Sequence, residues 1–151
     1  CGDLRHIFGS KSLSLKLKIK IYRAAVCSIL TYGSEAWNLT EMTSAMINGC
    51  NARCLSHITG RNAHVEASPL TRTLDLVGEI RQRLYRWLGH ILRMPQKRLV
   101  KEAVKVQYRM GLPGNIFMDT PPGLSFDQLE KLAMDRDLWR SGLPGLAQRS
   151  I

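Results

Sequence analysis

Hydrophobic residues recur at steps of three and four along much of the chain, a spacing that places them on one face of an α-helix. The first such pattern covers residues 13–31 and ends at Tyr32-Gly33, because glycine readily adopts the left-handed backbone that follows a helix. Residues 12–21 also alternate polar and apolar side chains, which is typical of a strand. We favour a helix because its pattern continues for two more turns, and a strand is the alternative.

A second helix is expected to begin at Asn38 and to end at Gly60. Asn38 is a good N-terminal cap, and Glu41, three residues later, can complete a capping box. Residues 61–74 are polar and interrupted by Pro69, so a loop is expected there. The buried side of the second helix is expected to carry Met42, Met46, Ile47, Cys50, Cys54, Leu55 and Ile58.

The third helix, over residues 75–94, carries the most regular apolar stripe in the chain. A fourth helix is expected over residues 97–110. Ser125 and Gln128 have the spacing of a capping box, which predicts that a fifth helix runs over residues 125–140.

These patterns predict an all-α fold of about five amphipathic helices in an irregular bundle, rich in loops at residues 61–74 and 111–124. We expect two parts along the chain. Residues 1–110 would form a helical region with basic helices, and residues 111–151 a Pro/Gly-rich linker followed by the C-terminal helix.

The charged residues bear on function, because they are unevenly distributed along the chain. The chain carries 22 Lys and Arg against 12 Asp and Glu, a formal net charge of +10. Nine basic and two acidic side chains fall within residues 76–109, whereas residues 110–137 hold two basic and five acidic ones. Such a block is typical of a surface that faces a polyanion. On charge alone, a solvated face is an equally good explanation.

The basic side chains of the third helix fall on one face, away from its apolar stripe, at about 100° per residue. Guanidinium and ammonium groups donate hydrogen bonds to phosphates, which gives affinity without reading base sequence. Trp87 lies towards the apolar stripe, so core packing is favoured over base stacking, whereas Tyr85 is expected to be more open. For His90 a plain surface role is the alternative. The predicted nucleic-acid contacts are Arg83, Arg86, His90, Arg93, Lys97, Arg98 and Lys101.

Motifs for catalysis are missing from the sequence. It contains no Walker A loop, no GxGxxG, no HExxH and no GxSxG, and Asp135 and Asp137 would diverge on a helix. Cys50, Cys54 and His57 share one helix face, but structural zinc sites usually combine a CxxC turn with four ligands, so core packing is favoured. We therefore expect no catalytic residue, no cofactor and no metal site.

The cysteines and the apolar runs bear on location. Four cysteines are too few for a disulfide framework and are typical of reduced intracellular thiols. No apolar run approaches the roughly 18–20 residues that a membrane-spanning helix needs, so we expect no membrane partner. An intracellular location is expected, with the nucleus as one option. Because the chain begins with Cys1, we also expect a fragment of a longer polyprotein.

Three segments carry a resemblance to a known family. Residues 21–37 read IYRAAVCSILTYGSEAW, residues 86–94 read RWLGHILRM, and residues 133–140 read AMDRDLWR. In this order and spacing they resemble the region downstream of the catalytic core in non-LTR (LINE-type) retrotransposon endonuclease–reverse transcriptases. The family often has another arginine where Tyr85 stands, so the basic stripe of this chain is slightly weaker.

The resemblance implies a mainly helical thumb-and-connector region that packs behind the reverse transcriptase palm and helps hold the template–primer duplex. The implied partners are the backbone of RNA or DNA and the upstream palm of the parent polyprotein, an RNA-directed DNA polymerase. The family's aromatic-Ala-Asp-Asp palm turn and its endonuclease residues are absent from this chain, so the resemblance transfers no catalytic residue.

Two other functions remain open at this point. The amphipathic helices could form a protein-interaction module that packs on a polymerase core or another partner, with the charge serving only solubility. An independent metal-dependent enzyme is the third and weakest hypothesis, because no acidic residues converge.

Overall fold

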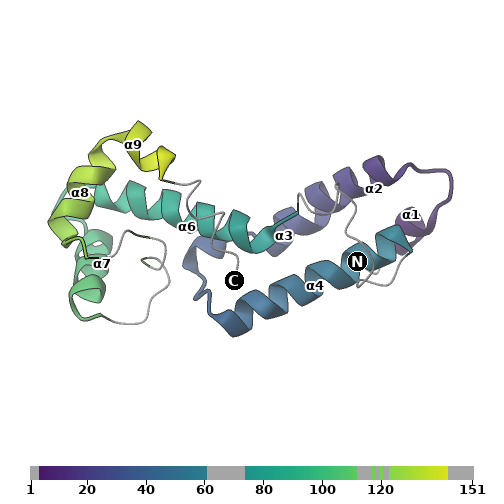
Figure 1. Cartoon of the computed structure of the whole chain (residues 1–151), viewed down its shortest axis with the longest axis horizontal. Helices are drawn as coiled ribbons and strands as arrows, with labels where there is room; N and C mark the ends of the chain where they lie inside the picture. The colour runs from purple at the N-terminus through teal and green to yellow at the C-terminus, as the bar shows by residue number, and fades with distance from the viewer. Residues whose placement is uncertain (1–3, 61–73, 112–116, 118–119, 121–122, 143–151) are drawn as a thin grey trace. The chain divides into compact units, whose positions relative to one another are not determined.

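The computed structural model describes residues 4–60, 74–111, 117, 120 and 123–142. Every regular element in those residues is a helix and none of them forms a strand, which confirms the predicted all-α fold (Figure 1). The loop expected at residues 61–74 lies outside the described residues apart from Leu74, as does most of the loop expected at residues 111–124.

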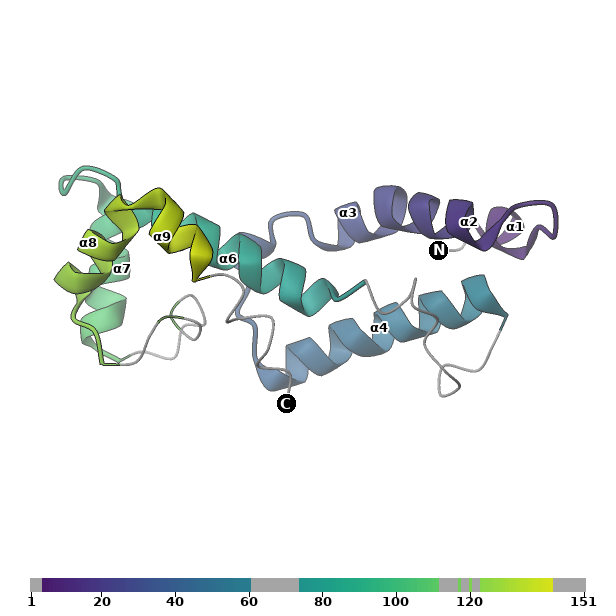
Figure 2. The ribbon, with the colours of Figure 1, turned by 45° about the horizontal axis from the view of Figure 1, so that its top comes forward.

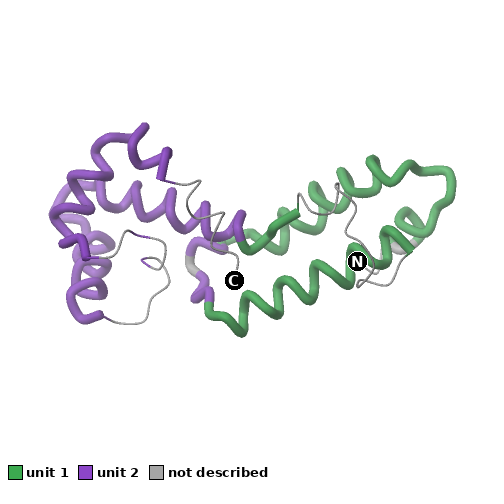
Figure 3. Tube along the Cα trace, in the orientation of Figure 1, with its two compact units in different colours: residues 1–33, 40–77 green, residues 34–39, 78–151 purple. Residues whose placement is uncertain are grey.

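The chain forms two compact units (Figure 3). Unit 1 combines residues 1–33 with residues 40–77, and unit 2 combines residues 34–39 with residues 78–151. The short segment 34–39 therefore leaves unit 1, and the chain returns to that unit at residue 40. The boundary that the sequence suggested between residues 110 and 111 falls inside unit 2.

Three successive helices of unit 1, α2 (Leu15–Ile21), η1 (Tyr22–Cys27) and α3 (Ser28–Leu30), form one continuous helical stretch. The Ser14 side chain caps it by accepting a hydrogen bond from the backbone N–H of Leu17. The helix expected here is confirmed, and the strand alternative is wrong. Ile19 and Tyr22 are both buried, and a step of three places two residues on one face of a helix but on opposite faces of a strand. The π-helical hydrogen bonding of η1 has no signal in the sequence.

A short helix that the sequence did not suggest, α1 (Arg5–Gly9), packs with α2 against the long helix α4 (Glu41–Thr59) (Figures 1 and 2). The rings of Phe8 and Tyr22 meet edge to face, with centroids 6.5 Å apart. Asn51 of α4 joins two further segments. Its Oδ1 accepts a hydrogen bond from the Tyr22 hydroxyl at 2.9 Å, and its Nδ2 donates to the carbonyl oxygen of Leu74 at 2.9 Å. Buried hydrogen bonds thus supplement apolar packing in unit 1.

Helix α4 begins two residues later than expected. Its N-terminal cap is Thr40 rather than Asn38, and the capping box pairs Thr40 with Thr43 rather than with an acidic residue. The two hydroxyl groups satisfy both backbone N–H groups that a capping box must satisfy, so Glu41 becomes the first helical residue. The predicted end at Gly60 is confirmed, because its φ of 66° is the left-handed cap conformation.

Unit 2 is built on helix α6 (Leu76–Leu92), whose first two residues are counted with unit 1. It is followed by α7 (Leu99–Arg109), α8 (Phe126–Met134) and α9 (Arg136–Ser141). All four helices contribute to one hydrophobic core. Its buried residues are Tyr85, Leu88, Ile91, Leu92, Val104, Phe126, Leu129, Ala133 and Trp139. The third and fourth predicted helices are confirmed to within two residues at each end.

The fifth predicted helix is divided in two at Asp135. Ser125 and Gln128 form the expected capping box and start α8. Asp135 has an extended backbone, and its Oδ1 accepts hydrogen bonds from the N–H groups of Asp137 and Leu138 at 3.0 and 2.9 Å. The carboxylate thereby ends α8 and caps α9, a competition with helical hydrogen bonding that short polar side chains favour.

Helix α9 packs directly on α6 at Gly89. A Cβ atom at Gly89 would lie 2.4 Å from Nε1 of Trp139, so only glycine permits this approach. The Trp139 indole stacks on Tyr85 with centroids 4.2 Å apart and planes at 11°, and its Nε1 donates to the Tyr85 carbonyl oxygen at 3.2 Å. The expectation that Tyr85 is open is wrong, because this stacking leaves it only 4% exposed.

Candidate nucleic-acid interface

Helix α6 has a fully apolar side and a cationic side. Ile80, Leu88 and Ile91 are completely buried on the first. Arg86 and His90, one turn apart on the second, are exposed, and Arg83 is half-buried. Nη2 of Arg86 donates to Oε1 of Gln82 in the same helix at 3.3 Å. These three predicted site residues therefore share one surface of unit 2.

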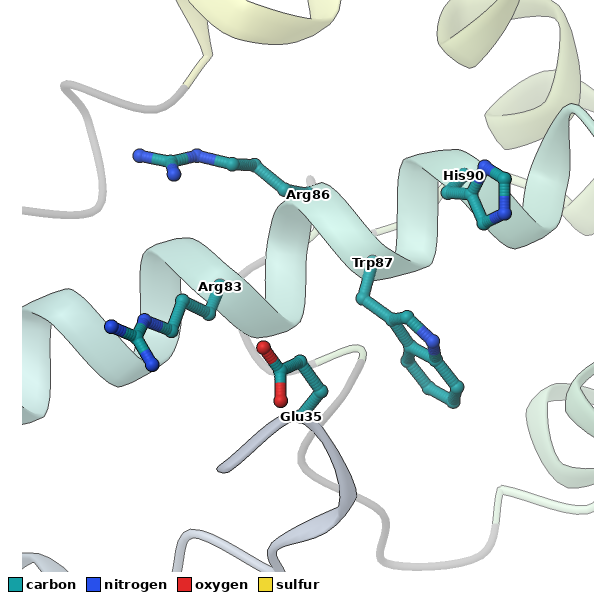
Figure 4. Close-up of a pocket in the computed structure, with 5 residues that line it drawn as sticks. All are labelled: Glu35, Arg83, Arg86, Trp87 and His90. Carbon is teal, nitrogen blue, oxygen red and sulfur yellow. The ribbon is translucent and has the colours of Figure 1, made fainter. Parts of the chain in front are cut away.

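An open pocket of about 550 Å³ lies along this surface (Figure 4). Four of its lining residues come from α6, and the fifth, Glu35, comes from the 3₁₀ helix η2 (Ser34–Ala36). Gly33, with a φ of 66°, makes the turn that leads into η2. In Figure 4 the Glu35 carboxylate points towards α6, between the side chains of Arg83 and Trp87. The lining is Glu35, Arg83, Arg86, Trp87 and His90.

Trp87 belongs to both the core and the pocket. It is half-buried and packs against the hydrophobic core of unit 2, as the sequence led us to expect. The same side chain lines the pocket together with Arg86 and His90, and Figure 4 shows it on the side of α6 where Glu35 lies. Core packing fixes the position of the indole, and its remaining surface is available for contact with a ligand.

Arg93 lies where three guanidinium groups gather. It is half-buried, and its Nη1 donates to the carbonyl oxygen of Ala133 at 2.8 Å. Burial lowers the pKa of Arg93, and the positive charges of Arg136 and Arg140 lower it further. Arg140 pairs with Asp137 at 3.7 Å, and both are highly exposed. An anion at this place would relieve the repulsion among the three arginines.

Arg136 and Arg140 were not among the predicted contacts, because their nearness to Arg93 depends on α9 folding back onto α6. The only signal in the sequence was the segment at residues 133–140, where both arginines flank a tryptophan. Trp139 is buried while Arg136 and Arg140 are exposed, so one short helix serves the core and the cationic surface together.

The structure does not support a phosphate-binding role for Lys101. Its side chain is 2% exposed, and its Nζ lies 2.9 Å from Oε1 of Glu130. The same ammonium donates to the carbonyl oxygens of Leu92 and Met94, each at 2.8 Å. Lys101 therefore satisfies carbonyl groups at the C-terminus of α6 and holds α7 and α8 to it. Its positive charge suggested an exposed position on α7. The groups that bury it, the Glu130 carboxylate and the Leu92 carbonyl oxygen, belong to other helices.

Lys97 and Arg98 occupy the turn between α6 and α7, and both are exposed. Arg98 is the N-terminal cap residue of α7, yet its side chain makes no capping hydrogen bond. Basic side chains are therefore exposed in this turn as well as on α6. We call the accessible set the cationic face; it comprises Arg83, Arg86, His90, Arg93, Lys97, Arg98, Arg136 and Arg140.

The hypothetical zinc ligands lie on α4 in unit 1. Cys50 and Cys54 are half-buried and His57 is exposed. Within the described residues no group of three or more His, Cys, Asp or Glu side chains could hold a metal ion. The thiol of Cys54 instead lies near the Tyr22 hydroxyl, whose pKa is raised, first by burial and then by Cys27 and Cys54.

No helix among the described residues is long and apolar enough to cross a membrane. Comparisons with protein families, with curated proteins and with solved structures found no match for this chain.

Proposed function

We propose that this chain is a non-catalytic C-terminal region of a LINE-type reverse transcriptase and that it binds the backbone of RNA or DNA through the cationic face. The observation that carries the binding proposal is the separation of α6 into a buried apolar side and an exposed cationic side. Arginines fixed on a helix whose other side is packed in a core present their guanidinium groups to successive phosphates.

The physical basis of this binding is charge neutralisation. Each phosphate that a basic side chain neutralises releases condensed counterions, so affinity falls steeply with salt. The half-buried Arg93 is held to Ala133 and feels the positive charges of Arg136 and Arg140, which an anionic partner would offset. Such contacts position a duplex without selecting its sequence.

The polymerase assignment is supported by what the three resembling segments do in the fold. Residues 86–94 supply core residues such as Leu88 and also the exposed Arg86 and His90. Residues 133–140 supply Ala133 and Trp139 to the same core. Residues 21–37 include the buried Tyr22 of unit 1 and the pocket residue Glu35. The segments that resemble the family thus contribute to both units and to the candidate site, together with residues outside them such as Phe126, Lys97 and Arg98.

Fluorescence anisotropy with a labelled RNA–DNA hybrid tests the binding proposal. The triple variant Arg86→Ala, Lys97→Ala, Arg98→Ala is compared with a control that removes three positive charges elsewhere, Arg53→Ala, Arg109→Ala, Lys131→Ala. The site variant is expected to weaken binding and to reduce the slope of log affinity against log salt by about 0.9 for each phosphate that the protein no longer neutralises. Equal effects of both variants, or a parent protein whose binding does not depend on salt, would contradict the proposal.

A protein-interaction module is the second candidate, favoured by an exposed apolar stripe on α7. Leu99, Val106 and Met110 are 86%, 50% and 66% exposed and lie at steps that place them on one side of this helix. The stripe would pack on the polymerase core. The double variant Leu99→Lys, Val106→Lys should then fail to co-purify with that core. The control double variant Arg109→Ala, Lys131→Ala should still co-purify. Equal recovery of the two variants would contradict this candidate.

A further inference from the structure

The pocket beside the cationic face contains one residue that phosphate binding does not explain. Arg83, Arg86 and His90 suit an anion, but Glu35 brings a carboxylate to the same lining. An ionised carboxylate only accepts hydrogen bonds, and it repels a phosphate. A ligand that uses the whole pocket would therefore combine an anionic group with hydrogen-bond donors.

Trp87 adds a third requirement, which is a flat aromatic surface. Its indole is held by the core of unit 2 and lines the pocket next to Glu35 and His90 (Figure 4). Nucleobases of every kind stack on such side chains. The pocket volume of about 550 Å³ lies in the range of small-ligand sites and accommodates one nucleotide.

The carboxylate distinguishes among the bases. The Watson–Crick edge of guanine presents two adjacent donors, the N1–H and the 2-amino group, which match the two oxygens of one carboxylate. Adenine and cytosine place an acceptor beside their amino group, and uracil places its single N–H between two carbonyl oxygens. Unpaired bases in a single strand expose these edges to protein side chains.

We propose that this pocket binds one unstacked guanine nucleotide of a bound strand. The base would stack on Trp87 and donate two hydrogen bonds to Glu35, while the basic residues of the lining would contact phosphates along the strand. This inference rests on the proposed function, because the cationic face would deliver the strand to the pocket. It goes beyond that function by giving the chain a base preference.

Competition between short oligomers tests the proposal with the whole chain. The probes are labelled oligouridines of about nine nucleotides, either unmodified or carrying one central guanosine, adenosine or inosine. The guanosine oligomer is expected to bind about tenfold more tightly than the adenosine and unmodified oligomers. Inosine lacks the 2-amino group, so its oligomer should lie between them.

The variant Glu35→Gln keeps the size of the side chain and removes the paired acceptors. It should abolish the preference for guanosine and leave binding of plain oligouridine equal or tighter. Glu102→Gln, which removes an exposed negative charge on α7, is the matched control and should keep the preference. In nuclear magnetic resonance spectra, guanosine monophosphate alone should shift the indole N–H signal that disappears in Trp87→Phe, and adenosine monophosphate should not.

The two hypotheses fail in different ways. Salt-dependent binding of all oligomers without a preference for guanosine would overturn the guanine pocket and leave backbone binding intact. A preference that survives in Glu35→Gln would likewise overturn it and would leave Glu35 as a counter-charge for the neighbouring arginines. If no oligomer binds in a salt-dependent way, the proposed function itself is wrong, and the inference falls with it.

Discussion

Helix α4 in unit 1 and helix α6 in unit 2 divide their residues differently between buried and exposed positions. Three of the 19 residues of α4 are buried, whereas nine of the 17 residues of α6 are buried. Met42 and Met46, which the apolar pattern placed on the buried side of α4, are 75% and 66% exposed. Because the apolar and polar positions of α6 are well separated, this helix packs on the core with one side only. Its polar side then becomes a defined surface.

The two units also hold their helices together by different interactions. In unit 1, Asn51 carries the hydrogen bonds that join α4 to Tyr22 and Leu74. In unit 2, an aromatic and aliphatic core with Trp139 against Gly89 holds the helices. The three tryptophans of the chain all belong to unit 2, so their fluorescence reports on that unit. Each unit can therefore be perturbed and observed separately.

The largest expected effect is that of removing Trp139. Trp139→Ala deletes the ring that stacks on Tyr85 and fills the space above Gly89, and it should lower the free energy of unfolding of unit 2 by about 4 kcal/mol. Urea unfolding followed by the fluorescence of the remaining tryptophans measures the change. Trp37→Ala, at an exposed position of the same unit, is the control; equal destabilisation by both variants would refute the packing role of Trp139.

The next effect concerns the buried ammonium of unit 2. Lys101→Met should destabilise unit 2 by about 3 kcal/mol, because it leaves the Glu130 carboxylate without its ion-pair partner, with only Gln96 still donating to it, and removes the ammonium donor of two carbonyl groups. Adding Glu130→Gln should recover part of that stability, since the unpaired charge is removed. The same urea titration measures both variants. Lys105→Met on the same helix is the control, and a destabilisation as large as that of Lys101→Met would argue against the buried network.

A smaller effect is expected in unit 1. Asn51→Ala removes both side-chain hydrogen bonds and leaves the Leu74 carbonyl buried, at a cost of about 2 kcal/mol. Hydrogen exchange of the α2 and α4 backbone amides measures it, while tryptophan fluorescence should report little change in unit 2. The exposed Asn48→Ala on the same helix should have almost no effect. Protection that Asn51→Ala leaves unchanged would show that apolar packing alone holds α4.

The smallest effect separates the sequence pattern from the observed cap. Thr40→Ala should destabilise α4 by about 1 kcal/mol, because it removes one half of the capping box. Asn38→Ala, at the position that the sequence favoured, should cost less. Circular dichroism during urea unfolding compares the two variants. A larger destabilisation by Asn38→Ala would mean that the helix starts where the sequence pattern first indicated.

Local features of the fold were predictable because they depend on neighbours in the chain. The helix of residues 125–134 follows from the capping box of Ser125 and Gln128, and the end of α4 follows from Gly60. The first long helix follows from its three- and four-residue spacing. The division at Asp135 was missed because an aspartate can either lie on a helix surface or cap a new helix. In this chain Asp135 caps a new helix, α9, and Trp139 of that helix packs on α6.

The candidate site was only partly predictable, for a related reason. Arg86, His90, Lys97 and Arg98 are accessible, as their positions on the helices suggested. Lys101 has the same charge and a similar sequence position, but Glu130 on α8 draws its ammonium into the interior. Glu35 lies in the segment at residues 21–37, but nothing local marked it as a site residue, because it reaches the pocket only through residues 34–39, which belong to unit 2.

By itself, the sequence determined that the chain is helical, that residues 76–92 have one apolar and one cationic side, and that the excess charge gathers there. These properties follow from periodicity and composition, which need no knowledge of distant partners. Only the tertiary structure decided that Tyr85 and Lys101 are buried, that Arg136 and Arg140 approach Arg93, and that Glu35 faces α6. Burial and charge environment depend on residues from other helices, and their spacing along the chain does not encode how those helices meet.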